Sequence, residues 1–251
     1  MIVENCHPML LADAGNSSVK FAVAKSARSR PCIIARIANA DLTTAKVRSL
    51  AARSGAVAAA AACVVPRTAG ILRAAMPRLA MIGPASPLNF RTSVDRRTAG
   101  ADRIANMAEA AHRFGGNVIV ADFGTAATFD LLDARGCFAG GAIAPGLRTL
   151  ASALSAGTAL LPVADTALPR RWAATNTCEA LRAGVTGGYA GLVTHLIGKL
   201  ATASGKGKLL SIVFTGGDAR TVARLAKCGA RVDPLWTLRG IRVLGELAMR
   251  P

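Results

Sequence analysis

The chain alternates between short apolar runs and polar turns that contain glycine, and one such arrangement occurs twice. Met9 to Ala12 leads into the turn Asp13-Ala14-Gly15-Asn16-Ser17-Ser18. Val118 to Ala121 leads in the same way into Asp122-Phe123-Gly124-Thr125-Ala126-Ala127, and a further apolar run follows each turn. Two apolar runs joined by a tight glycine turn predict a β-hairpin at each place.

After each hairpin, the pattern predicts a third strand and then alternating helices and strands. In the first part we expect strands 32–37, 57–65 and 79–82 and helices 41–53, 67–75 and 101–114, with Asp41 as a helix N-cap. In the second part we expect strands 137–143, 209–214 and 231–233, and helices from Pro145-Gly146 to Ser155, over 176–200, up to Cys228 and over 236–248. Gly115-Gly116 separates the parts, so the sequence predicts an α/β duplication with lobes 1–115 and 116–251.

The two predicted turns share one kind of chemistry. Each offers a carboxylate, then a glycine, then small hydroxyl or amide side chains. Glycine permits close approach of the backbone, exposed N–H groups and hydroxyls suit phosphate oxygens, and an Asp can hold a cation. A single Asp-x-Gly turn is also typical of an ordinary hairpin, but the pair predicts two related lobes that grip a nucleoside triphosphate in a cleft between them.

Composition and charge limit the class of protein. The chain has 251 residues, of which 52% are hydrophobic and 4% aromatic. It has no apolar run of membrane-spanning length and no signal-peptide pattern, so we expect a cytoplasmic protein without a membrane partner. The six cysteines have spacings that fit no zinc site. The net charge of +17 indicates either an anionic partner or a generally basic surface. Scattered basic residues favour the surface, with no specific nucleic-acid partner.

Five segments in order resemble the motifs of the type III pantothenate kinase family, whose superfamily includes acetate and sugar kinases, Hsp70 and actin. The resemblance covers nearly the whole chain. The segments are Asp13-x-Gly15-Asn16-Ser17-x-x-Lys20, Gly100-Ala101-Asp102-Arg103, Asp122-x-Gly124-Thr125-Ala126-x-Thr128-x-Asp130 followed by Gly140-Gly141-x-Ile143-x-Pro145-Gly146, Thr177 with Gly184 and Gly188, and Phe214-Thr215-Gly216-Gly217-Asp218. The segment with Thr177, Gly184 and Gly188 resembles the part of the family that closes on pantothenate.

The resemblance implies two ribonuclease H-like lobes of the actin-like ATPase fold and phosphorylation of pantothenate by ATP. It also implies a role for each matching residue. ATP and its Mg²⁺ would lie on Asp13, Ala14, Gly15, Asn16, Ser17, Ser18, Val19, Lys20 and Thr125. Pantothenate would lie on Gly100, Ala101, Asp102, Arg103 and Thr177, with Asp102 as general base. Asp122 would bind K⁺ or NH₄⁺, and the protein would be a homodimer.

One departure from the family pattern keeps two alternatives open. The family has a Tyr and a Pro shortly before its Gly-x-Asp-Arg motif, and the segment from Ser93 to Thr98 has neither. This puts the local wall of the substrate site in question, although the acidic residues remain. The alternatives are a non-catalytic regulatory or nucleic-acid-associated protein of the same fold, and a kinase for another small alcohol. Asp102 and Arg103 could also be ordinary residues at a helix start.

Overall fold

The computed structural model describes residues 7–25, 29–76, 78–204 and 210–250. The chain divides into two compact units, Met1–Gly115 with Leu235–Pro251, and Gly116–Pro234. The first unit contains strands β1 (Met9–Ala14), β2 (Ser18–Ala24), β3 (Cys32–Ala38), β4 (Ala58–Cys63), β5 (Leu79–Met81) and β6 (Arg91–Thr92), and helices η1 (Asn39–Asp41), α1 (Thr44–Ser54), α2 (Pro66–Ala75), α3 (Ala101–Phe114) and α7 (Trp236–Ala248).

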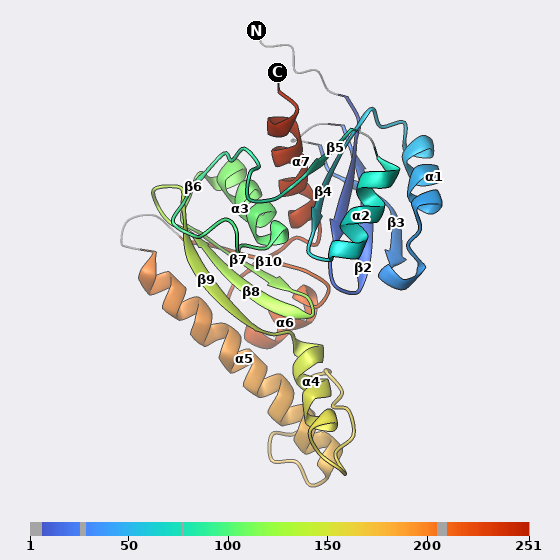
Figure 1. The fold of residues 1–251 in the computed structure, drawn as a ribbon. Helices are drawn as coiled ribbons and strands as arrows, with labels where there is room; N and C mark the ends of the chain where they lie inside the picture. Colours follow the sequence, from blue (N-terminus) through green and yellow to red (C-terminus); the bar gives the residue numbers. More distant parts are fainter. Residues whose placement is uncertain (1–6, 26–28, 77, 205–209, 251) are drawn as a thin grey trace. The chain divides into compact units, whose positions relative to one another are not determined.

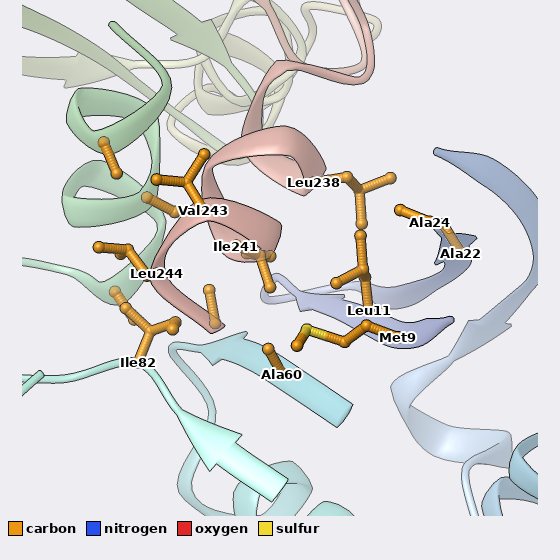
Figure 2. Close-up of a cluster of buried hydrophobic side chains, with 14 of the residues drawn as sticks. Met9, Leu11, Ala22, Ala24, Ala60, Ile82, Leu238, Ile241, Val243 and Leu244 are labelled. Carbon is orange, nitrogen blue, oxygen red and sulfur yellow. The ribbon is translucent and has the colours of Figure 1, made fainter. Parts of the chain in front are cut away.

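The sheet of the first unit is buried on both faces. Met9 and Leu11 of β1 pack with α3 and α7, whereas Leu10 and Ala12 pack with α1 and α2. Because successive side chains of a strand point to opposite faces, an almost continuous apolar run is what a strand between two helical layers requires. Figure 2 shows the α7 side of this core, where Leu238, Ile241 and other α7 side chains lie above Met9, Leu11 and Ala60.

The second unit is built around a similar sheet. Its strands are β7 (Val118–Phe123), β8 (Ala126–Leu132), β9 (Cys137–Pro145), β10 (Ser211–Thr215) and β11 (Arg231–Val232), and its helices are α4 (Leu147–Ala156), α5 (Thr177–Ala203) and α6 (Ala219–Ala226). Ile119, Ala121 and Phe123 of β7 form a core with residues of the three helices. Phe123 makes an edge contact with the ring of Phe214 at a centroid distance of 4.8 Å.

Strand order reveals the duplication. In the first unit the order is β3-β2-β1-β4-β5, and in the second the corresponding order is β9-β8-β7-β10-β11. In both units the first three strands in sequence pair antiparallel, and the next two join parallel to the first. The expected α/β fold with two duplicated ribonuclease H-like halves is therefore confirmed.

The unit that α7 joins and the start of α1 both differ from those expected. Helix α7, which the sequence places in a lobe 116–251, packs on α3 and β1 of the first unit, because Gly240 lies against the backbone of Ala105 and Gly245 against Met9. Helix α1 starts at Thr44 rather than after Asp41. Thr43 is its N-cap, with Oγ1 accepting from Lys46 N at 3.3 Å.

A further difference is the short strand β6, which lies between the expected strand 79–82 and the expected helix 101–114, where we expected no strand. The strand expected at 209–214 begins at Ser211 in the structure, and residue 209 lies outside the described residues.

Candidate functional site

The first hairpin carries a partly buried ion pair next to its turn. Asp13 and Lys20 lie opposite each other in the β1–β2 ladder. Lys20 Nζ donates to Asp13 Oδ2 at 3.1 Å, and only 18% of the Lys20 side chain and 14% of the Asp13 side chain are exposed. A carboxylate and an ammonium group are thus held together beside the turn.

The backbone of this turn is fixed from outside the hairpin. Gly15 N donates to Ser18 O at 3.2 Å, which closes the turn. The side-chain amide of Asn39 donates to Gly15 O at 2.9 Å and to Asn16 O at 2.8 Å. Asn39 follows β3, so the third strand delivers the group that rigidifies the turn. Sequence reasoning missed Asn39, because no local pattern links residues 24 positions apart.

Asp102 lies in the first turn of α3, the position predicted for the general base. Its Oδ1 accepts from Arg103 N at 2.8 Å. Gly100 is the helix N-cap, and a Cβ atom at that position would collide with Asp102 Oδ1. The glycine of the Gly-x-Asp-Arg segment therefore leaves room for the carboxylate to fold back over the start of the helix.

Burial raises the pKa of the Asp102 carboxyl above its usual range. The negative charge of Asp13 adds to this increase, while the Arg103 N–H and guanidinium oppose it. The first unit therefore places Asp13 close enough to Asp102 for its charge to act on that carboxyl group. A carboxyl group with a raised pKa accepts a proton more readily than an ordinary carboxylate does.

The second hairpin turn presents a different set of groups. Gly124 N donates to Ala126 O at 3.1 Å, closing this turn as Gly15 closes the first. Asp122 lies opposite Thr128 in the β7–β8 ladder. Thr128 is 9% exposed, and its buried hydroxyl has no hydrogen-bond partner among the described residues. An orphaned buried oxygen next to a carboxylate fits the ligand preferences of a hard cation.

The start of α4 packs directly on this second turn. Gly146 N donates to Thr125 O at 2.9 Å, and Thr149 Oγ1 donates to the same oxygen at 2.6 Å. A Cβ atom at Gly146 would overlap Gly124 O. The Pro145-Gly146 segment is therefore required for a close approach of helix and turn, and it leaves a helix N-terminus beside the predicted phosphate motif, where anions are favoured.

The adenosine-like segment lies against the other side of Asp122. Thr215 pairs with Asp122 in the parallel β10–β7 register. Gly216 has φ +91°, and a Cβ atom there would meet Asp122 Oδ1 and the Phe123 backbone. Asp218 N donates to Phe123 O at 3.1 Å. The second unit thus brings together the Asp122–Thr125 turn, the start of α4 and the Thr215–Asp218 loop.

One residue absent from the predicted site connects these parts. Arg148, in the first turn of α4, forms an ion pair with Asp218 at 2.9 Å, and 77% of its side chain is exposed while that of Asp218 is 11% exposed. Its guanidinium therefore lies between the turn-binding end of α4 and the adenosine-like loop. No motif in the sequence points to Arg148, because its partner lies far away along the chain.

Thr177 lies at a pocket within the second unit. It is the first residue of α5, whose N-cap Asn176 accepts from Glu179 N at 3.0 Å. The pocket has a volume of about 670 Å³, and its lining includes Leu150, Leu154, Thr177, Leu181 and Gly184. Thr177 and Gly184, two positions of the segment predicted to close on pantothenate, therefore border one apolar cavity.

Some of the predicted site residues have side chains that a ligand could not contact. Ala14, Val19 and Ala101 are buried in the core of the first unit, so only their backbone could meet a ligand. Asn16, Ser17, Thr125 and Thr177 are exposed. Tyr189, the only tyrosine, is fully buried in the core of the second unit and makes an edge contact with Phe123.

The described residues hold neither a clustered metal site nor a membrane span. No three His, Cys, Asp or Glu side chains in that part of the chain come together as a metal site. Nor does any helix formed by these residues have the length and apolar character needed to cross a membrane.

Comparison with known proteins decides the family. The sequence model of the type III pantothenate kinase family matches residues 9–199. The type III pantothenate kinase of Methylacidiphilum infernorum is 34% identical over 244 residues, which cover 96% of this chain and 89% of that protein. The chain belongs to the type III pantothenate kinase family. Another member, from Roseiflexus castenholzii, is 38% identical over 194 residues, or 75% of each chain.

Solved structures support the fold. A Baf family protein from Campylobacter jejuni aligns with a TM-score of 0.60 at 21% identity, covering 94% of this chain and 96% of that one. Glucokinase from an Antarctic psychrotroph aligns with a TM-score of 0.50 at 16% identity, covering 96% and 99%. Together with the duplicated sheets, these likenesses place the chain in the actin-like ATPase fold.

Proposed function

We propose that this enzyme transfers the γ-phosphoryl group of ATP to the primary hydroxyl of pantothenate, giving ADP and 4′-phosphopantothenate, the first step of coenzyme A synthesis. Membership of the type III pantothenate kinase family supports this activity. The observation that carries the chemistry is the partly buried Asp102 carboxylate at the start of α3, whose pKa the charge of Asp13 helps to raise. A reaction that uses ATP and feeds coenzyme A synthesis also suits the cytoplasm.

Asp102 is the proton acceptor in this proposal. The pantothenate hydroxyl oxygen forms a bond to the γ-phosphorus, the bond from that phosphorus to the β,γ-bridging oxygen breaks, and the hydroxyl proton moves to Asp102. ADP leaves with the bridging oxygen. Arg103, next to the base, is suited to pair with the pantothenate carboxylate in a two-point geometry. General-base catalysis of this kind contributes about 10²–10⁴-fold.

The first turn is proposed to hold the ATP phosphates. Backbone N–H groups and side chains of Asn16, Ser17 and Ser18 would bind phosphate oxygens, and Lys20 would supply positive charge. Asp13 provides carboxylate oxygens of the kind that Mg²⁺ prefers, and one or two carboxylates plus substrate phosphates are its usual ligands in such enzymes. When bound, Mg²⁺ neutralises charge that develops on the phosphates.

The second turn is proposed to hold a monovalent cation and part of the nucleotide. Asp122 and the unpartnered Thr128 hydroxyl are oxygen donors from adjacent strands. Potassium or ammonium at this place would offset phosphate charge. Thr125, exposed at the tip of the turn, would contact ATP.

Thr177 and the apolar pocket beside it are proposed as part of the pantothenate site, and the protein as a homodimer. Several large apolar side chains that are close in sequence to the residues lining the pocket are exposed. They include Leu160 (92% exposed), Val163 (63%) and Trp172 (70%). A surface of this kind is typical of a protein interface. Analytical ultracentrifugation over a range of concentrations tests this: a monomer at micromolar concentration would contradict the dimer.

A coupled assay for ADP release tests the activity. The purified protein is given Mg·ATP, potassium and either pantothenate or one of a panel of other small primary alcohols. We expect turnover that depends on pantothenate, with 4′-phosphopantothenate identified by mass spectrometry. Turnover with a different alcohol alone would establish a kinase of other specificity. No turnover with any alcohol by a folded protein that binds ATP would favour the non-catalytic alternative.

A further inference from the structure

Helices α1 and α2 form a two-helix layer on one face of the first sheet (Figure 1). Val47 and Leu50 of α1 and Leu72 and Ala75 of α2 face the sheet core. Arg48 Nη2 donates to Ala74 O at 3.0 Å and so joins the two helices. We call the exposed side of this two-helix layer the α1–α2 face.

This face is basic and carries no acidic side chain of its own. Neither helix contains an Asp or a Glu. Its exposed cations are Lys46, Arg48, Arg53, Arg67 and Arg73. The acidic residue adjoining it in sequence is Asp41, which comes before α1 and accepts from Lys46 Nζ through its backbone oxygen at 2.7 Å. Within the described residues, none of the five cations forms an ion pair with a carboxylate.

The other exposed residues on these helices have small side chains. Between the cations lie Ala45, Ser49, Ala52, Gly70 and Ala74. Neither helix has an aromatic side chain for stacking on unpaired bases, as single-strand binding requires. Neither exposes a row of large apolar side chains, as insertion into a membrane surface requires. Positive charge on long, flexible side chains is the recognition element that the face offers.

We propose that the α1–α2 face binds the sugar-phosphate backbone of a nucleic-acid duplex without sequence preference. Lys46 and Arg53 are two helical turns apart, about 10 Å along the axis, and Arg67 and Arg73 are separated by about 9 Å. Cations spread over this distance on two neighbouring helices can reach several phosphates of one duplex. Phosphate contacts position a protein on a duplex and carry no sequence information. Binding of this kind does not depend on the proposed kinase activity.

The test compares two variants that each lose four positive charges. One carries Lys46→Gln, Arg53→Gln, Arg67→Gln and Arg73→Gln, and keeps Arg48 because that residue links the helices. The control carries Arg220→Gln, Arg224→Gln, Lys227→Gln and Arg231→Gln, which are exposed residues on and after α6 in the second unit. Binding of two unrelated DNA duplexes of equal length is followed by fluorescence anisotropy from low to moderate concentrations of KCl. Circular dichroism and pantothenate-dependent turnover monitor the fold.

We expect the wild-type protein and the α6 variant to bind both duplexes equally, with affinity that falls steeply as salt rises. The α1–α2 variant should bind at least about tenfold more weakly at low salt. The slope of log affinity against log salt should decrease by about 0.9 for each phosphate that the variant no longer neutralises. Should this variant fail to fold, the two double variants, one on each helix, are measured instead, and each should show about half the change in slope.

Four results would overturn the proposal. The first is no binding by the wild-type protein at low salt, and the second is an equal loss of affinity in the α6 variant. The third is tighter binding to the separated single strands than to the duplex. The fourth is tighter binding to vesicles that contain phosphatidylglycerol than to the duplex. An equal loss in both variants would mean that net charge rather than this face attracts the duplex.

Discussion

The two hairpin turns share one backbone design but differ in the groups around it. In the first, Asp13 is paired with Lys20 across the ladder, and Asn39 fixes the turn through two side-chain hydrogen bonds. In the second, Asp122 lies opposite the neutral Thr128, and the start of α4 fixes the turn through Gly146 and Thr149. The first turn therefore has its own cation, whereas the second has a helix N-terminus and an orphaned hydroxyl.

This difference suits the two turns to the two different roles that we propose for them. A covalently attached ammonium group next to Asp13 suits transient binding of charged phosphates, because the chain itself supplies balancing charge. An oxygen-rich site at Asp122 suits a cation taken from solution. Substitutions at the two turns and their neighbours, and replacement of the monovalent cation in solution, test this difference.

The largest effect is expected from Asp102→Asn in the first unit. Asn keeps the shape of the side chain but cannot accept the proton, so kcat should fall by about 10²–10⁴-fold while ATP affinity measured by calorimetry stays nearly unchanged. Asp41→Asn is the control, because Asp41 is an exposed carboxylate of the same unit that lies just before α1 and outside the proposed site. Near wild-type turnover of Asp102→Asn would remove Asp102 from the role of base.

The same variant has a predicted effect on stability. The folded-state pKa of Asp102 is raised, so between the unfolded and folded pKa values the folded state holds more protons. Stability therefore falls as pH rises through this window and remains lowered at neutral pH. Asp102→Asn should then unfold at a higher temperature than wild type at neutral pH, with a smaller difference near the ordinary pKa of Asp, about 3.9. Wild-type kcat should decline on the acidic side with an apparent pKa above that ordinary value.

The next effect concerns the cation at the second turn. Replacing all potassium by sodium, without ammonium, should lower kcat about tenfold or more, equivalent to roughly 1.4 kcal/mol in the barrier. Thr128→Val should raise the potassium concentration needed for half-maximal activity. Ser18→Ala in the first turn should alter the KM for ATP but leave the potassium requirement as it is. Activity that is equal in sodium and potassium would contradict a cation site at Asp122.

A smaller effect is expected from glycine substitutions at the two turns. Gly146→Ala forces a Cβ atom into the Gly124 carbonyl, so unfolding free energy should fall by about 1–3 kcal/mol, the usual range for overpacking. Gly15→Ala is the control, because its Cβ atom would lie 3.9 Å from the nearest atom, Ser18 O. Chemical denaturation measures both. Equal losses would mean that α4 does not hold the second turn closely.

The smallest effect is expected from Arg148→Ala. An ion pair with one largely exposed partner stabilises a protein by about 1 kcal/mol or less, so the fold should be retained. Because the guanidinium lies between α4 and the Thr215–Asp218 loop, the KM for ATP should rise about two- to fivefold, within the same energy range. Arg220→Ala, an exposed arginine of α6, should leave this KM unchanged. An unchanged KM in Arg148→Ala would place the residue outside the nucleotide site.

Most strands, the hairpin turns and most helices could be predicted from the amino-acid sequence, because they depend on short-range signals. A few neighbouring residues are enough to predict that β1 is buried and that a glycine turn follows it. The glycine that ends α3 is a local signal of the same kind. The repeated Asp-x-Gly turns also predicted the duplication, and the five motif segments in order predicted the family. Local signals did not locate the start of α1, where Thr43 rather than Asp41 caps the helix.

Only the tertiary structure decided which distant residues complete each turn. Asn39 reaches Gly15, Gly146 reaches Thr125 and Arg148 reaches Asp218, and the members of each pair lie on different elements. It also decided that α7 joins the first unit, through close contacts at Gly240 and Gly245. The periodicity of apolar side chains predicts that one face of an element is buried, but it does not predict which element covers that face. Many apolar faces could pack together, and only close packing in the folded structure selects one arrangement.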